Sequence, residues 1–131
     1  MASIVPVAKA LYLCDYHVGY ASGKIDLYGV FKAIQPKQYP FRKGPFVCFF
    51  QLIGGLGTVN FHIDVRRASD MKVLDWSGTR TLQFPDRDTL VQVAWTFPGC
   101  TFGESGLYFV ELYCDNTWVT DTTLKLREIE S

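Results

Sequence analysis

The sequence predicts an all-β domain, a two-sheet antiparallel sandwich of about eight or nine strands with an immunoglobulin-like architecture. Apolar residues recur at every second position along most of the 131 residues, as expected of pleated strands that bury one face. Gly or Pro interrupts this alternation about every 8–12 residues, a spacing typical of sandwiches and barrels. Aromatic residues make up 15% of the chain, and they favour half-buried pleated surfaces. A closed β-barrel is the alternative, because it shows the same periodicity.

The length indicates one domain, because 131 residues fall within the usual range for a single hydrophobic core. Hydrophobic residues make up 48% of the chain, enough to bury such a core without disulfides or metals. We therefore expect residues 1–131 to form a single β-sandwich domain.

The first half of the chain contains three expected strands and a long loop. Val7–Cys14 and Lys24–Ile34 are strands, and Gly29 interrupts the alternation of the second, which indicates a bulge. Three prolines deny regular hydrogen bonding to Gln35–Pro45, so this segment is expected to be a loop. Phe46–Ile53 is apolar on both faces, as in a central strand that is covered on both sides or meets a partner.

The second half alternates more regularly. Gly54–Gly57 is expected to reverse the chain as a hairpin into Val59–Ala68, whose Phe61, Ile63 and Val65 should point inward. Ser77-Gly78 is expected to be a further reversal. The other expected strands are Met71–Trp76, Thr79–Phe84, Leu90–Phe97, Gly106–Cys114 and Trp118–Arg127.

Two short segments of the second half predict particular turns. Asp115-Asn116 tolerates positive φ and should close the last hairpin. The passage from Gly106 to Tyr108 resembles the tyrosine corner of immunoglobulin-like sandwiches, in which a Tyr hydroxyl bonds back to the backbone. True immunoglobulin domains have a Cys two residues after that Tyr, where this chain has Val110. The resemblance therefore concerns architecture only.

Four short motifs, in this order, cover nearly the whole chain. They are Leu13-Cys14-Asp15, Leu27-Tyr28-Gly29-Val30-Phe31, a Gln51-Leu52-Ile53-Gly54-Gly55 hairpin, and the passage from Phe97-Pro98 to Gly106-Leu107-Tyr108. In this combination the chain resembles a family of short uncharacterised bacterial all-β proteins. The resemblance supports the fold and implies no activity.

Charge and hydropathy exclude several classes of partner. Thirteen basic and thirteen acidic side chains cancel, so the basic surplus that nucleic-acid binding usually requires is missing. No apolar run reaches the roughly 18 residues of a membrane span, and no secretory signal is visible. We expect a cytoplasmic protein that binds neither nucleic acid nor membrane. In a reducing compartment its four cysteines should be small buried hydrophobes.

No catalytic or metal site is expected, and hence no enzyme and no cofactor. Cys14 and His17 are three positions apart, so on one strand they would project to opposite faces and could not form a nucleophile–base pair. His62 and Asp64 share a strand face, but no third ligand follows at a telling spacing. The glycines at 54, 55 and 57 lack the Lys-Ser/Thr pair and the helix of a phosphate-binding loop.

The most informative functional signal is an apolar surplus on the sheet. Four apolar side chains lie on strand faces that a simple sandwich would leave exposed to solvent: Phe49, and Leu107, Phe109 and Tyr113 of the last hairpin. Exposed apolar surface of this kind marks interaction sites. We therefore predict a non-enzymatic interaction module that self-associates or docks a protein partner through these residues. The alternative is that the loop at residues 35–45 covers this surface.

A second hypothesis is a small-ligand-binding sandwich with a pocket at one end. Tyr39, Phe41, Arg42 and Trp118 supply aromatic and cationic groups near the proline-containing loop. Prolines would hold this loop in place and lower the ordering cost of binding.

Overall fold

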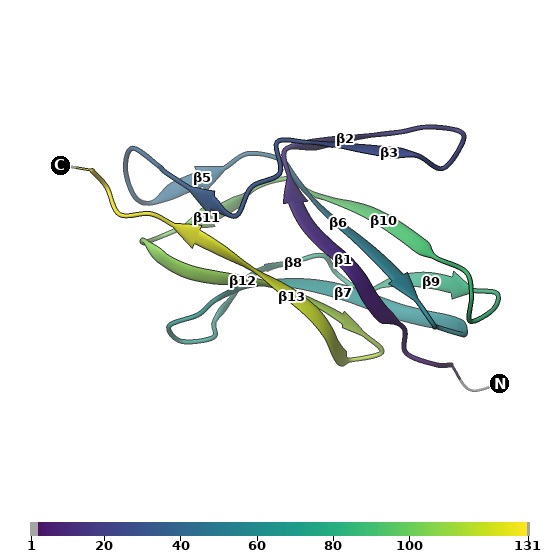
Figure 1. The fold of residues 1–131 in the computed structure, drawn as a ribbon. Coiled ribbons are helices and arrows are strands. Elements are labelled where there is room, and N and C mark those ends of the chain that lie inside the picture. The colour runs from purple at the N-terminus through teal and green to yellow at the C-terminus, as the bar shows by residue number, and fades with distance from the viewer. Residues whose placement is uncertain (1–2, 131) are drawn as a thin grey trace.

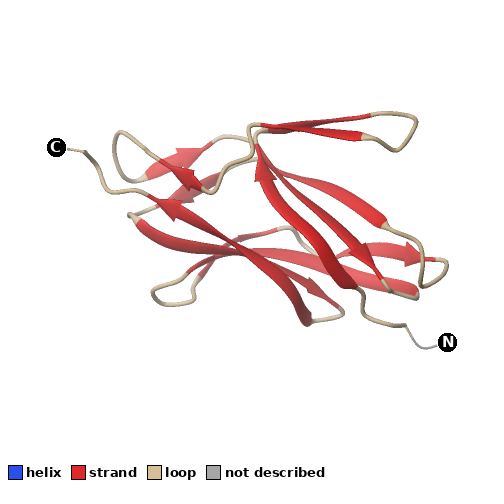
Figure 2. Ribbon diagram, in the orientation of Figure 1, coloured by secondary structure: helices blue, strands red, loops and turns tan. Residues whose placement is uncertain are grey.

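The structure, a computed structural model, describes residues 3–130, so the expected domain limits at residues 1 and 131 lie outside the described residues. Every regular element in this range is a strand (Figure 2). No helix in residues 3–130 is long and apolar enough to cross a membrane.

The small sheet contains three antiparallel strands in the order β1-β6-β10. These strands are β1 (Val7–Cys14), β6 (Phe46–Ile53) and β10 (Val91–Phe97). The continuous apolar run of β6 therefore forms the central strand, as the sequence predicted.

The large sheet lies opposite the small one and has the order β4-β13-β12-β7-β8, with β9 also paired to β7 (Figure 1). Its pairs are antiparallel, except that β4 runs parallel to the end of β13. Its strands are β4 (Ala33–Ile34), β7 (Gly57–Arg67), β8 (Val73–Trp76), β9 (Arg80–Phe84), β12 (Gly106–Cys114) and β13 (Thr117–Leu126).

Two short strand pairs complete the fold. The hairpin of β2 (Tyr16–Gly19) and β3 (Ile25–Tyr28) lies over the side of the small sheet that faces away from the large one (Figure 1). β5 (Phe41–Lys43) pairs with β11 (Cys100–Phe102) at the end of the sandwich where the C-terminus lies. The fold is thus an all-β sandwich with open sheets, and the alternative of a closed barrel is wrong.

The core lies between the two sheets and follows the predicted alternation. Phe61, Ile63 and Val65 of β7 are buried, as are Tyr108 and Val110 of β12. Both strands belong to the large sheet and turn every second side chain inward. Phe50 and Leu52 of β6 add the apolar face of the small sheet to the same core.

The glycine segment after β6 is not a hairpin. It carries the chain from the small sheet to the large one, because β6 and β7 lie in different sheets and are not paired with each other. Gly54 and Gly57 have φ values of 81° and 77°, as expected of turn glycines. Gly55 instead lies against the Phe84 ring, where an added Cβ would come within 2.9 Å of ring atoms.

The expected reversal at Ser77-Gly78 is also wrong. β8 and β9 both run antiparallel to β7 and follow one another along its edge. Ser77 interrupts them and stays bonded to β7, since its Oγ accepts from the Ile63 backbone N–H at 2.8 Å. The interruption is therefore a kink in one long edge strand.

The expected strand Lys24–Ile34 is broken at Gly29, which has a φ of 70°. The Asp15 carboxyl group occupies the space where a Gly29 side chain would lie, and it pairs with Lys43 at 3.1 Å. This contact ties the base of the β2–β3 hairpin to the body of the protein. β5 lies in the segment expected to be a loop, and β2 and β11 are further strands that the sequence did not predict.

All four cysteines are free and buried, as expected. Burial raises the pKa of both Cys100 and Cys114 to about 12, and that of Cys14 is raised by burial as well. Their thiols are therefore protonated and inaccessible.

Candidate functional site

The side of the large sheet that faces away from the core, here called the outer face, carries an unusual set of side chains. The strand register arranges them in four successive rows across β13, β12 and β7. The rows are Trp118–Tyr113–His62, Asp121–Glu111–Asp64, Thr123–Phe109–Arg66, and Lys125–Leu107. Val73 and Trp76 of β8 extend the face, opposite Arg66 and Asp64 respectively.

The first row, the ring row, is aromatic. The rings of His62 and Tyr113 stack with their centroids 4.8 Å apart and their planes 5° apart. Trp76 and His62 form a T-shaped pair, with ring centroids 6.2 Å apart. Trp118 pairs with Tyr113 in the register and is 53% exposed, whereas Trp76 is 55% exposed. Two accessible indoles therefore flank a stacked pair in the middle of the sheet.

The second row contains three carboxylates, and the neighbouring Arg66 pairs with two of them, Glu111 and Asp64. Its Nε donates to Glu111 Oε1 at 2.7 Å, and its Nη2 donates to Asp64 Oδ2 at 3.0 Å. A third bond, from Nη1 to the Met71 carbonyl oxygen, fixes the guanidinium in place. The hydrogen bond that Arg66 donates to Glu111 is the main reason that the Arg66 pKa is raised. Glu111 and Asp64 are only 7% and 8% exposed, so this network is part of the framework of the face.

The remaining two rows are mainly apolar. Phe109 is half-buried beside Arg66, whereas Leu107 is 48% exposed next to Lys125. Val73 is also exposed. The outer face therefore has rings and carboxylates at one end, and aliphatic and basic groups at the other.

Three of the four predicted interaction residues lie on this face: Leu107, Phe109 and Tyr113. Phe49 does not, because it lies on β6 of the small sheet and is buried. The β2–β3 hairpin covers this side of β6, so the prediction that Phe49 belongs to an interaction surface is wrong (Figure 1). The cover is this hairpin, not the loop at residues 35–45.

The predicted pocket is not formed by its four residues. Phe41 and Arg42 lie on β5, and the Tyr39 hydroxyl donates to the Arg127 carbonyl oxygen just beyond the end of β13. Trp118 lies near the start of β13, about 30 Å of strand away from Arg127. The error arose because residues of one long strand can lie at opposite ends of the sandwich.

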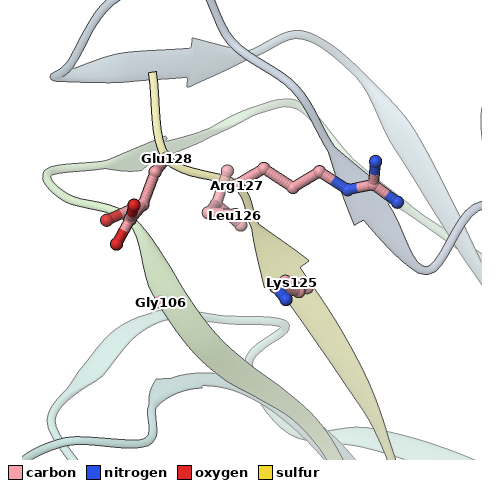
Figure 3. A pocket seen from close by; sticks show the side chains of 6 residues that line it. Gly106, Lys125, Leu126, Arg127 and Glu128 are labelled. Atoms are coloured by element: carbon pink, nitrogen blue, oxygen red, sulfur yellow. The ribbon is translucent and has the colours of Figure 1, made fainter. Parts of the chain in front are cut away.

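A hollow of about 420 Å³ lies beside the end of β13 and is lined by Ser105, Gly106 and residues 125–128. Figure 3 shows that the Arg127 side chain extends away from Gly106, whereas Glu128 lies near it. Across residues 3–130, no group of three His, Cys, Asp or Glu side chains is placed to hold a metal ion.

Sequence patterns alone revealed only part of the outer face. His62 and Asp64 were expected to share a strand face without forming a metal site, and Trp76 and Arg66 had no expected role. The signal for Arg66 was present, since it follows Asp64 by two residues and shares its face. Only the pairing of β7 with β12 shows that Glu111 lies beside both Asp64 and Arg66.

The fold and this face define a β-sandwich protein with an aromatic and ionic sheet surface. The chain belongs to the family of unknown function DUF6941, whose model matches residues 9–127. No curated protein and no solved structure matches it.

Proposed function

We propose that this chain is a non-enzymatic protein-interaction module that self-associates through the outer face. The setting that we propose is the cytoplasm of a bacterium. The observation that supports the proposal is the order of the rows, which makes the face complementary to itself.

The complementarity follows from placing a two-fold axis across the strands, between the second and third rows. Such an axis keeps each strand over the same strand of the second copy and reverses its direction, as in an isologous interface. Trp118 then meets the partner's Lys125, a cation–π pair. Tyr113 meets the partner's Leu107, which buries apolar surface from both copies.

The same two-fold axis also brings complementary side chains of β7 and β8 together. Asp64 comes over the partner's Arg66, and Trp76 comes over the partner's Val73. Carboxylates do not face carboxylates anywhere along this axis, so the arrangement avoids like-charge contacts. Trp, Tyr and Arg, which this face presents together, are the residues most enriched among those that dominate binding energy.

The size of the face sets the expected strength. Four strands about 4.8 Å apart and seven residues of β12 give a face of about 19 Å by 24 Å. This area, about 460 Å² per copy, is smaller than that of a stable specific interface and fits a weak, transient one. The dimer is therefore expected to be weak, and its population should rise with protein concentration.

Sedimentation equilibrium at several protein concentrations tests this proposal. We expect a reversible monomer–dimer equilibrium that Leu107→Asp abolishes, because the new charge would be buried against the partner's Tyr113. Lys125→Glu should weaken it, because the cation facing the partner's Trp118 is lost. The matched control is Val30→Asp, since Val30 is 52% exposed and lies outside the outer face.

The result that overturns the proposal is a strict monomer at every concentration. Dimerisation that Val30→Asp weakens as much as Leu107→Asp does would overturn it too. Circular dichroism of each variant confirms that the substituted chain remains folded.

A further inference from the structure

A second, polar feature lies next to the outer face, one step beyond the ring row. It is a hollow of about 230 Å³ between β7 and the β12–β13 turn. Its lining residues are Asn60, His62, Thr79, Asp115 and Asn116. The self-association proposed above uses none of the side chains at 60, 79, 115 and 116, so the hollow needs its own explanation.

The framework of the hollow is fixed by hydrogen bonds. Asp115 Oδ1 accepts from the Asn60 backbone N–H at 3.0 Å, and the Asp115 N–H donates to the Asn60 carbonyl oxygen at 2.7 Å. The Asn60 side-chain oxygen accepts from Thr81 at 3.1 Å. The turn that carries Asn116 is closed by two residues with positive φ, 49° at Asp115 and 61° at Asn116. The hollow therefore exists before any ligand arrives.

Several polar groups in the hollow remain available. Among residues 3–130, no hydrogen bond engages the Thr79 hydroxyl, the Asn116 side chain or the Asn60 side-chain NH₂ group. A hydroxyl and two amides offer both donors and acceptors without charge. The one carboxylate, Asp115, already accepts two hydrogen bonds, from Asn60 and from Ser3.

Aromatic rings lie near the hollow. The His62 ring is part of its wall. Trp76 precedes Thr79 by three residues and packs on the edge of His62, whereas Trp118 follows Asn116 by two residues. Both indoles are more than half exposed. A ligand held here thus meets uncharged hydrogen-bonding groups in the hollow and flat apolar rings at its rim.

We propose that this hollow in the monomer binds a neutral carbohydrate, one sugar unit in the hollow and the adjoining units along the rim, where Trp76 and Trp118 are free of the dimer contacts proposed above. A pyranose ring has hydroxyls around its edge and an apolar C–H surface on its face, the combination that amides, a hydroxyl and exposed indoles match. Phosphorylated ligands fit poorly, because no Lys or Arg lines the hollow. The volume is below that of pockets that enclose drug-sized molecules, so it suits the end or one unit of a glycan.

A glycan array, followed by titration of the full chain with each neutral oligosaccharide that binds, tests this proposal. We expect binding of at least one neutral glycan. Thr79→Val and Asn116→Gly should each weaken it about three- to tenfold, since each removes one neutral hydrogen-bonding group. Asn116→Gly removes the amide and keeps the positive φ that the turn requires. The matched control is Thr101→Val on β11, which should leave binding unchanged.

An absence of neutral glycan binding would overturn the proposal, and so would binding that Thr79→Val and Asn116→Gly together leave undiminished. A peptide library screened alongside covers the other class of ligand, and peptide binding that these variants abolish, without glycan binding, also overturns it. Neither substitution alters the outer face, so sedimentation of the same variants separates failure here from failure of self-association.

Discussion

The hydroxyl of Tyr108 donates to the backbone carbonyl oxygen of Glu104, four residues upstream, at 2.6 Å. Tyr108 is 1% exposed, and its ring packs edge-on against Phe102 at 4.9 Å. This is the tyrosine-corner hydrogen bond that the Gly106–Tyr108 passage predicted. It ties the segment between β11 and β12 to the first residues of β12, where the chain enters the large sheet.

Tyr108→Phe is expected to lower the free energy of unfolding by about 1–2 kcal/mol, because it removes this bond and leaves the Glu104 carbonyl without its partner. Urea denaturation followed by fluorescence measures the change. Tyr39→Phe is the control, since it removes a bond of equal length to Arg127 at an exposed site and should cost less. Equal losses in the two variants would contradict a special role of Tyr108.

Gly55→Ala is expected to destabilise the fold by about 1–3 kcal/mol through overpacking, since the new Cβ would lie 2.9 Å from Phe84 ring atoms. Gly103→Ala is the control, because no atom lies within 4 Å of a Cβ there. The double variant Gly55→Ala/Phe84→Leu should lose less stability than the sum of its single substitutions. If the losses in unfolding free energy of the two single variants simply add up in the double variant, the Phe84 contact is not the cause.

Arg66→Ala is expected to cost about 2 kcal/mol of stability, because it leaves Glu111 and Asp64 largely buried without their cation. The adjacent Arg67 gives a matched control. It pairs with Asp70 and Glu104, whose side chains are 47% and 58% exposed, so Arg67→Ala should change stability by less than about 1 kcal/mol. Thermal unfolding of both variants checks the difference, and similar losses would refute it.

The buried thiols predict how reactivity and stability depend on pH. At pH 8 the native protein should not react with a thiol reagent, whereas the denatured protein should react at all four cysteines. Because the folded pKa values of Cys100 and Cys114 are raised to about 12, their contribution to stability is full below the unfolded value near 9. It is lost as pH rises toward 12, because only the unfolded thiols ionise there. The urea concentration at the denaturation midpoint should therefore decrease as the pH is raised from 8 to 11, and it should decrease less in Cys114→Ala. Rapid labelling of the native chain by the thiol reagent would contradict the prediction.

Strand positions and their inward faces could be predicted because alternation is a local property of the chain. Val7–Cys14 and Phe46–Ile53 begin and end where the sequence placed them. The Asp115-Asn116 turn and the inward face of β12 also follow from local chemistry, since positive φ and two-residue periodicity depend on a few neighbouring residues.

The partners of these strands could not be predicted, because pairing joins segments that are far apart in the sequence. β5 and β11 are three residues each, too short to show a period, and they become strands only by bonding to one another. The site shows the same limit. Leu107, Phe109 and Tyr113 were found from one strand alone, whereas Arg66 joined them only through the register of β7 with β12.

The sequence by itself determined that this protein is built of pleated strands and which side of each strand is apolar. The reason is that the alternation of apolar and polar side chains can be read from consecutive residues. Only the tertiary structure decided which apolar sides stay accessible. Phe49 and Leu107 look alike in the sequence, yet the β2–β3 hairpin covers the first and nothing in residues 3–130 buries the second. The physical reason is that exposure depends on what packs above a side chain, and here that segment is set by long-range folding.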